Sequence, residues 1–433
     1  MPYKKLIGTI LIFLACCSSR SYGENTIGQD LLYPELVNKF YTAIHQRLFW
    51  FDTSANKMRE LMLQKIDSSA YIGTDRSKYG YNELVEINRT WIKEINDSSN
   101  LLRLDMLFTD AAIGYCKDLY QGSGISSGIS YDEWSARYML KDNDYLVGQL
   151  AAVKSSNELS RLINSLTPSG TEYIAYNTEF NKQYTDNNFV KAKQVAIAMN
   201  FYRWMYHFKF ERYIVVNIPS ASLKYYENDT VRLFSKMIVG NPSKRTPRFD
   251  ATCREVILYP YWNVPKDIAL KELVPKYKKH PTLVDKENMQ ILDAKGKIVD
   301  PYSINWSLYS AYYFPYRLRQ STGCDNSLGI LKFDLTSPFG VYLHDTNEKS
   351  LFKSGYRFRS HGCMRVEKAI ELGNYLLNNK LDTALLKACI KDENPVTLQL
   401  EKPVPVFVVY MTAYENNNTV SYYNDVYRLI INH

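Results

Sequence analysis

The feature that most constrains the fold of this chain is a change in its hydrophobic pattern close to residue 210. Before that point apolar residues recur at helical spacing, as they do in residues 34–51. After it, short segments rich in β-branched and aromatic residues follow one another, beginning with residues 212–219. The chain therefore predicts an α+β protein with a helical scaffold domain at 24–210 and a β-rich domain at 211–433.

The β-rich half contains a long stretch, at about 266–322, in which the strand pattern weakens. Aromatic side chains crowd its second part, residues 302–316. We interpret this stretch as an insertion that folds over the site as a lid or cap. A satellite layer with its own aromatic core is the alternative.

The N-terminus has the features of an export signal. Two lysines precede residues 6–15, an apolar run too short to span a bilayer. Residues 1–23 are therefore expected to be a signal peptide, and lipidation of Cys16 or Cys17 is the alternative way of processing it. In either case we expect an exported protein of the periplasm or cell envelope. Lipidation would in addition give it a lipid anchor.

The net charge limits the classes of partner, and the cysteines bear on the redox compartment. A net charge of +8 over 433 residues is mild, and its basic residues are dispersed, so no nucleic-acid partner is expected. Five cysteines lie beyond the export segment, far apart in sequence, which indicates neither a disulfide framework nor a CxxC metal site. An odd number leaves at least one thiol free, and a free thiol in an oxidising compartment suggests a function. These cysteines are Cys116, Cys253, Cys324, Cys363 and Cys389.

One segment, residues 340–366, brings a cysteine and two histidines close together. Cys363 follows His361 by two residues, and His344 comes directly after a predicted strand. A cysteine attacks as its thiolate, and a nearby imidazole can take the proton. A strand–loop–strand path could return the chain so that His344 lies beside Cys363.

The residues around Cys363 fit the same chemistry. Gly362 lets the backbone approach a substrate, and N–H groups near it could face a developing oxyanion. Arg365 would point to the same side as Cys363 in an extended segment, where its guanidinium suits a substrate carboxylate. A structurally paired charge is the alternative for Arg365.

Residues 360–366, Ser-His-Gly-Cys-Met-Arg-Val, resemble the signature of the L,D-transpeptidases, the YkuD-type catalytic domain. That pattern also places a histidine some 14 to 17 residues before the Ser-His-Gly-Cys segment, where this chain has His344. Residues 340–346, 212–219 and 259–265 are similar to the larger YcbB-like subgroup. Members of that subgroup usually carry a peptidoglycan-binding module in the helical half, and no clear copy of it is present.

The resemblance implies a role for each matched residue. Cys363 would be the nucleophile and His344 its base, oriented by a backbone carbonyl. Ser360, His361 and Gly362 would shape the pocket and the oxyanion site. Arg365 and Tyr342 would contact the substrate.

The resemblance also implies the reaction. A tetrapeptide stem of peptidoglycan would acylate Cys363 with loss of D-alanine, and the side-chain amine of a second stem would take the acyl group to give a 3→3 cross-link. No metal or organic cofactor is needed, and carbapenem-type inhibitors are expected to bind.

Three alternatives remain open. The same thiol could serve an L,D-carboxypeptidase or hydrolase, or an enzyme that attaches or releases wall proteins, because the motif does not identify the acceptor. A non-catalytic wall-binding scaffold protein is an alternative of another class. A metal site would have to combine Cys324 with the residues of the motif, and its spacing matches no zinc pattern.

Overall fold

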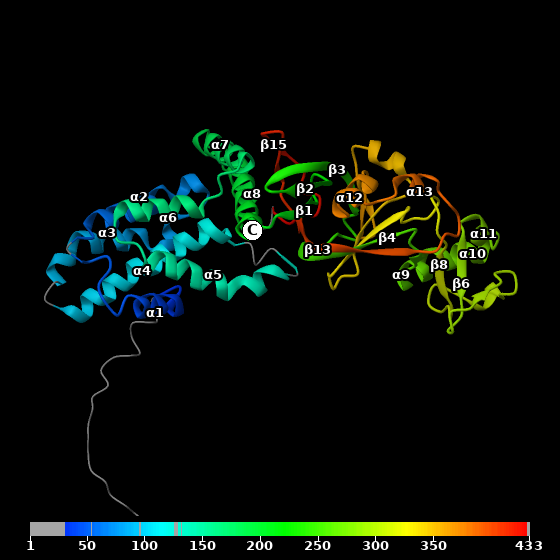
Figure 1. The fold of residues 1–433 in the computed structure, drawn as a ribbon, viewed down its shortest axis with the longest axis horizontal. Coiled ribbons are helices and arrows are strands. Elements are labelled where there is room, and N and C mark those ends of the chain that lie inside the picture. Colours follow the sequence, from blue (N-terminus) through cyan, green and yellow to red (C-terminus); the bar gives the residue numbers. More distant parts are fainter. Residues whose placement is uncertain (1–30, 53, 95–96, 125–128, 131, 431–433) are drawn as a thin grey trace, which may run out of the picture.

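The computed structural model of this chain describes residues 31–430, except for residues 53, 95–96, 125–128 and 131. The molecule is elongated (Figure 1). The helical half lies at one end, a large sheet occupies the middle, and the insertion lies at the other end. The predicted signal peptide lies outside the described residues.

Helices make up the described chain up to residue 207. Three short 3₁₀ helices, η1 (Ser68–Ile72), η2 (Arg76–Tyr79) and η3 (Trp91–Glu94), connect the α-helices. The α-helices are α1 (Pro34–Ala43), α2 (Asn56–Asp67), α3 (Tyr81–Thr90), α4 (Ser98–Gln121), α5 (Trp134–Ala151), α6 (Ser156–Leu166), α7 (Thr171–Thr185) and α8 (Phe189–His207). Among the described helices, none is both long and apolar enough to cross a membrane.

Local capping explains where the longest of these helices begins. Residues 84–108 carry apolar residues at helical spacing, and the structure divides them between α3 and α4. The Asp97 side chain accepts hydrogen bonds from the N–H groups of Ser99 and Asn100, so it caps the start of α4. At its other end, α4 stops at Gly122, whose φ of 76° few other residues adopt easily.

The β-rich half is built around one nine-stranded sheet in the order β11-β3-β12-β10-β9-β4-β13-β1-β2. Because β2 also pairs with β3, the sheet closes on itself. Its strands are β1 (Arg212–Asn217), β2 (Ser222–Glu227), β3 (Thr230–Gly240), β4 (Phe249–Leu258), β9 (Leu331–Leu335), β10 (Leu343–His344), β11 (Phe358–Ser360), β12 (Met364–Val366) and β13 (Val396–Val409). Helices α12 (Ala369–Leu376) and α13 (Thr383–Lys387) and the hairpin of β14 (Ala413–Asn416) and β15 (Thr419–Tyr422) complete this half.

Two apolar cores pack against the nine-stranded sheet, and one of them is shared with the helices. The first lies against β3, β4, β9, β13 and α12. The second joins α7 and α8 to β1, β13 and β14, with Trp204 packed edge-on against Phe407 at 5.2 Å between ring centroids. The scaffold is therefore fused to the sheet by buried side chains.

The insertion has its own small sheet and its own core. Strands β5 (Trp262–Asn263), β8 (Arg317–Gln320), β6 (Met289–Leu292) and β7 (Ile298–Val299) pair in that order. Trp306 stacks on Phe314 at 5.8 Å within this core. The helical segments are α9 (Lys266–Ile268), the π-helical turn η5 (Ala269–Leu273), α10 (Val274–Lys279), α11 (Leu283–Lys286) and the 3₁₀ helix η6 (Trp306–Leu308).

Pro275 is compatible with a helix at this place. Helix α10 begins at Val274, so Pro275 is its second residue. Because the π-helical turn η5 runs directly into α10, the missing N–H of Pro275 falls where the hydrogen-bond pattern changes from one helix type to the other.

A disulfide joins Cys324, which follows the insertion, to Cys389, which follows α13, with 5.2 Å between the two Cα atoms. The wide spacing of the cysteines had argued against a disulfide framework, and this bond corrects that expectation. The partners are 65 residues apart in sequence, so only the folded sheet brings them together. Cys116 and Cys253 are free and buried, and Cys363 is free and partly accessible.

Candidate active site

The candidate residues converge because two short strands lie side by side in the middle of the sheet. Strand β10 pairs in parallel with β12, so that Leu343 is opposite Met364 and His344 is opposite Arg365. Side chains alternate along a strand. Tyr342 and His344 therefore share one face with Cys363 and Arg365, while Leu343 and Met364 point into the apolar core.

Tyr342 is the residue that contacts both members of the expected pair. It forms hydrogen bonds with the Cys363 thiol through its backbone and its phenol. Its ring lies edge-on to the His344 ring, with 5.7 Å between centroids. Among the described residues, no hydrogen bond links Cys363 directly to His344, and Tyr342 contacts both of them in this resting arrangement.

His344 is held in its neutral form. Its side chain is buried, with 4% of the residue exposed, and Nδ1 lies against the backbone carbonyl of Asp345. Burial, followed by the positive charges of Arg365 and Lys332, lowers the pKa of His344 to about 3. If the carbonyl fixes the proton on Nδ1, Nε2 keeps the lone pair that a base requires.

The Cys363 thiol is also neutral at rest. Burial raises its pKa above that of an ordinary thiol, although hydrogen bonds from Tyr342 and the nearby charges of Lys332 and Arg365 act in the opposite direction. The ammonium of Lys332 lies 4.5 Å from the centroid of the Tyr342 ring. The site therefore contains two basic residues close to a thiol that has not yet lost its proton.

The turn before Cys363 is fixed by hydrogen bonds. The Ser360 hydroxyl donates to the Cys363 carbonyl and accepts from the Gly362 N–H at 3.2 Å. Thr246 donates to the Gly362 carbonyl at 2.8 Å. Gly362 has a φ of 118°, which requires glycine. Because the Gly362 N–H is already engaged, it is not a free oxyanion donor at rest, which leaves the Cys363 N–H as the other candidate.

Arg365 is paired within the protein. Its guanidinium forms an ion pair with Glu348 and lies 3.5 Å from the Thr346 hydroxyl. The Arg365 side chain is 18% exposed and that of Glu348 is 54% exposed. A substrate carboxylate would have to share or replace Glu348, a partner that the sequence motif did not reveal.

His361 faces the insertion. Its Nε2 lies 2.8 Å from Oε1 of Glu272, which belongs to η5, and Lys244 lies 2.9 Å from the same oxygen. Hydrogen bonds and charges from Lys244 and His361 outweigh burial and lower the pKa of Glu272. The insertion is thus tied by an ionised carboxylate to the residue two positions before Cys363.

Several site residues were not identified from the sequence. Lys332, Glu272 and Thr246 lie outside residues 340–366, and Glu348 lies within them but is not part of the motif. Nothing in their local patterns marks these four residues. Within the described part of the chain, no group of three or more His, Cys, Asp or Glu side chains is placed to hold a metal ion. Cys324, one member of the metal alternative, is engaged in the disulfide.

Comparison with protein families divides the chain in two. Residues 35–179 match a family described as a scaffold domain, and residues 211–398 match the L,D-transpeptidase catalytic domain. The predicted class, a helical scaffold followed by a β-rich YkuD-like domain, is therefore confirmed.

A protein of Haemophilus influenzae named "Putative L,D-transpeptidase" is 31% identical over 406 residues, which cover 92% of this chain and 78% of that protein. Two solved structures are much more distant. An L,D-transpeptidase from Mycobacterium smegmatis is 15% identical, with 46% of this chain and 58% of that chain covered and a TM-score of 0.21. An LD transpeptidase in complex with imipenem is 14% identical, with 46% and 59% covered and a TM-score of 0.20.

Proposed function

This chain belongs to the L,D-transpeptidase family, and from that premise we propose that it cross-links peptidoglycan by cysteine acyl transfer. The observation that carries the proposal is the strand register, which puts Cys363 and Arg365 on the same face as Tyr342 and His344. A nucleophile, a neutral base and a cation for a substrate carboxylate are the groups that such a transfer requires.

In the first half-reaction the Cys363 sulfur attacks the carbonyl carbon that follows the third residue of a tetrapeptide stem. The thiol proton passes to His344, and His344 returns it to the amine of the departing D-alanine. A thioester forms as the amide bond breaks. Backbone N–H groups near Cys363 stabilise the charge on the carbonyl oxygen.

In the second half-reaction the side-chain amine of another stem attacks the thioester. His344 takes a proton from that amine, the carbon–sulfur bond breaks, and the proton returns to the Cys363 sulfur. The products are a 3→3 amide cross-link and the free enzyme. No metal or organic cofactor enters this scheme.

Substrate binding would supply the basicity that His344 lacks at rest. Arg365 is the second largest cause of its low pKa, after burial. A stem carboxylate that joins Glu348 at Arg365 would add a second negative charge beside this guanidinium and raise the pKa of His344. The carboxylate would therefore both position the donor and prepare the base.

Intact-mass measurement of the protein after incubation with a tetrapeptide stem tests the nucleophile. We expect a thioester adduct on the wild type and on Cys116→Ala, whose thiol is buried, and none on Cys363→Ala. An adduct that survives on Cys363→Ala would reject the assignment.

Turnover tests the base. His344→Ala should fold, as judged by its melting temperature, and lose turnover by about 10²- to 10⁴-fold, the usual contribution of a positioned base. Unchanged turnover would remove His344 from this role.

Product analysis on purified muropeptides identifies the acceptor. Cross-linked 3→3 dimers support transpeptidation, whereas tripeptides without dimers would indicate an L,D-carboxypeptidase. Release or attachment of a wall-linked protein without dimers would point to that activity instead.

The proposed partners are donor and acceptor stem peptides, together with carbapenem-type inhibitors that acylate the same thiol. The proposed location is outside the cytoplasm, in the periplasm or cell envelope. The Cys324–Cys389 disulfide supports this location, because such bonds persist mainly in oxidising compartments.

A further inference from the structure

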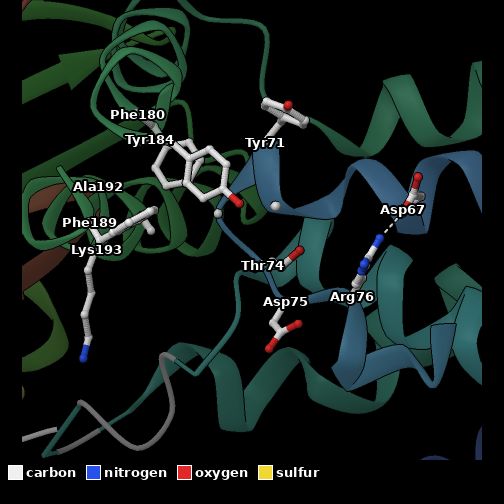
Figure 2. Close-up of a pocket in the computed structure, with 13 residues that line it drawn as sticks. Asp67, Tyr71, Thr74, Asp75, Arg76, Phe180, Tyr184, Phe189, Ala192 and Lys193 are labelled. Carbon is white, nitrogen blue, oxygen red and sulfur yellow. Dashed lines mark hydrogen bonds and ion pairs between the residues drawn. The ribbon is translucent and has the colours of Figure 1, made fainter. Parts of the chain in front are cut away.

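A groove of about 700 Å³ lies in the scaffold, away from the candidate active site (Figure 2). One wall is formed by α7 and α8 and the other by the turn that connects η1 to η2. Its volume is within the range of sites that bind small ligands. Neither the sequence motif nor the proposed chemistry assigns a role to it.

Aromatic rings form one continuous wall of this groove. Phe180 and Tyr184 stack with 5.8 Å between centroids, and Tyr184 meets Phe189 edge-on at 5.9 Å. From the opposite side Tyr71 lies edge-on to Tyr184 at 5.8 Å. Tyr71 is 54% exposed and Phe189 is 57% exposed, so ring surface remains open to a ligand. The four rings lie around the space in Figure 2.

Polar groups of both signs line the other wall. Thr74, Asp75 and Arg76 come from the turn, and Arg76 forms an ion pair with Asp67. Hydrogen bonds from Ser77 lower the pKa of Asp75, so this carboxylate is ionised. The groove thus combines open ring faces with charged hydrogen-bonding groups.

Buried contacts hold the polar wall in place. Arg203, which is fully buried, donates a hydrogen bond of 2.8 Å to the carbonyl of Ile72, within the turn. Gly73 has a φ of 75°, and a Cβ there would lie 3.0 Å from the Cβ of Ala196 on α8. The turn therefore approaches α8 as closely as a glycine permits, and the groove is preorganised before any ligand binds.

We propose that this groove binds the glycan strand of the cell wall, that is, a polymer of amino sugars with anionic substituents. A sugar ring has an apolar C–H face that can pack on an aromatic ring and hydroxyl groups at its rim that can reach a carboxylate or a guanidinium. A wholly apolar ligand would strip water from Asp75 and Arg76 without replacing its hydrogen bonds. The groove is also built from helices and a turn, so it offers an extended peptide no strand edge.

This inference rests on the proposed function, because it supposes that the substrate is part of a polymer with a glycan backbone. The scaffold itself would hold the strand, and the catalytic domain would reach the stems attached to it.

Cosedimentation with insoluble wall material tests the inference. The probes are purified sacculi and the glycan that remains after an amidase removes the stem peptides. Full-length Cys363→Ala protein is used as the parent, so that no acyl transfer occurs and glycan binding is measured independently of catalysis. Loss of the thioester in the earlier experiment would therefore defeat the proposed function without affecting this readout.

In that parent we expect binding to the stripped glycan. Combining Tyr71→Ala with Phe189→Ala should weaken it by about tenfold or more, as loss of exposed aromatic anchors usually does. Tyr71→Phe, which keeps the ring, should bind nearly as the parent does. Val190→Ala is a matched control, because Val190 adjoins Phe189 on α8 but is 75% exposed and does not line the groove.

Unchanged binding by the Tyr71→Ala, Phe189→Ala protein would overturn the inference, provided that its melting temperature matches that of the parent. Binding to intact sacculi but not to stripped glycan would also overturn it, since the ligand would then be the stem peptide. If the double variant is unfolded, Phe189→Ala and Tyr71→Ala are measured singly; each should weaken binding, and the inference fails if either leaves it unchanged.

Discussion

At the scale of single residues, the site consists of a thiol and an imidazole that are both neutral before substrate arrives. This state differs from a resting thiolate–imidazolium pair, in which a histidine has already taken the proton. Burial keeps the Cys363 thiol protonated and His344 unprotonated. The residues are therefore poised for proton transfer rather than already ionised.

The reactivity of the free enzyme toward iodoacetamide should show this state. Because burial raises the pKa of Cys363, alkylation should be slow near pH 7 and should keep rising as the pH increases beyond 9. Mass spectrometry at several pH values gives the rate. Cys363→Ala provides the background, which should be low because burial raises the pKa of both Cys116 and Cys253 to about 12. A rate that is already at its plateau at pH 7 would mean that Cys363 is ionised at rest.

His344 should make stability depend on pH. Its pKa is about 3 when folded and about 6.5 when unfolded, so below pH 6.5 the unfolded chain binds a proton that the folded chain does not. The free energy of unfolding contributed by this residue is therefore fully present above pH 6.5 and is lost progressively as the pH falls toward 3. Denaturant unfolding of the wild type and His344→Gln at pH 7 and pH 5 measures it. The wild type should lose more stability than the variant, and equal losses would contradict the prediction.

The sequence predicted the residues around the proposed nucleophile but not the contacts among them. Residues 360–366 are contiguous, so their motif can be read directly from the sequence. The contact of Tyr342 with the thiol depends on the register of β10 against β12, which short strands do not fix by their own pattern. Glu348 and Lys332 reach the site only through tertiary packing, so their roles could not be predicted.

At the scale of elements, the Cys324–Cys389 disulfide closes a long loop of the chain. It joins the segment after β8 to the segment after α13, and these enclose β9 to β12 with the whole candidate site. The sequence shows an odd number of cysteines beyond the export segment, but it does not show which of them form a disulfide. The insertion, by contrast, was recognised from its aromatic content, although the link from Glu272 to His361 was not.

Removing this disulfide should destabilise the protein by about 2–4 kcal/mol, because a cross-link between positions 65 residues apart restricts the unfolded chain. The variant Cys324→Ser, Cys389→Ser is compared with the wild type by denaturant unfolding. Reductant should lower the stability of the wild type and leave the variant unchanged. A wild type that is insensitive to reductant would show that the bond is not formed in solution.

At the scale of the whole molecule, the seam between scaffold and sheet contains a buried charge cluster. Lys224 on β2 forms ion pairs with Glu172 on α7 and with Glu415 on β14 at 2.7 Å. The side chains are 4%, 13% and 4% exposed, respectively. Burial raises the pKa of Glu172, so this carboxyl group takes up a proton more readily than an exposed glutamate does.

Lys224→Met should destabilise the protein by about 3–5 kcal/mol, because it leaves two buried carboxyl groups without a cation. The deficit should be smaller at pH 5 than at pH 8, since protonation of the carboxyl groups relieves it. Lys380→Met is the matched control. Its ion pair with Glu401 is 71% and 60% exposed, and its loss should cost no more than about 1 kcal/mol. Similar losses in both variants would contradict the prediction.

The disulfide also has a consequence for the order in which the protein matures. Cys363, which must stay reduced, lies between Cys324 and Cys389 in the chain. A polypeptide that emerges N-terminus first presents Cys324 to Cys363 before Cys389 is available. An early bond between Cys324 and Cys363 would block the proposed nucleophile, and only thiol–disulfide exchange could release it again. The proposed mechanism therefore requires an oxidation step that passes over Cys363, or an isomerase that exchanges an early Cys324–Cys363 bond for the Cys324–Cys389 bond.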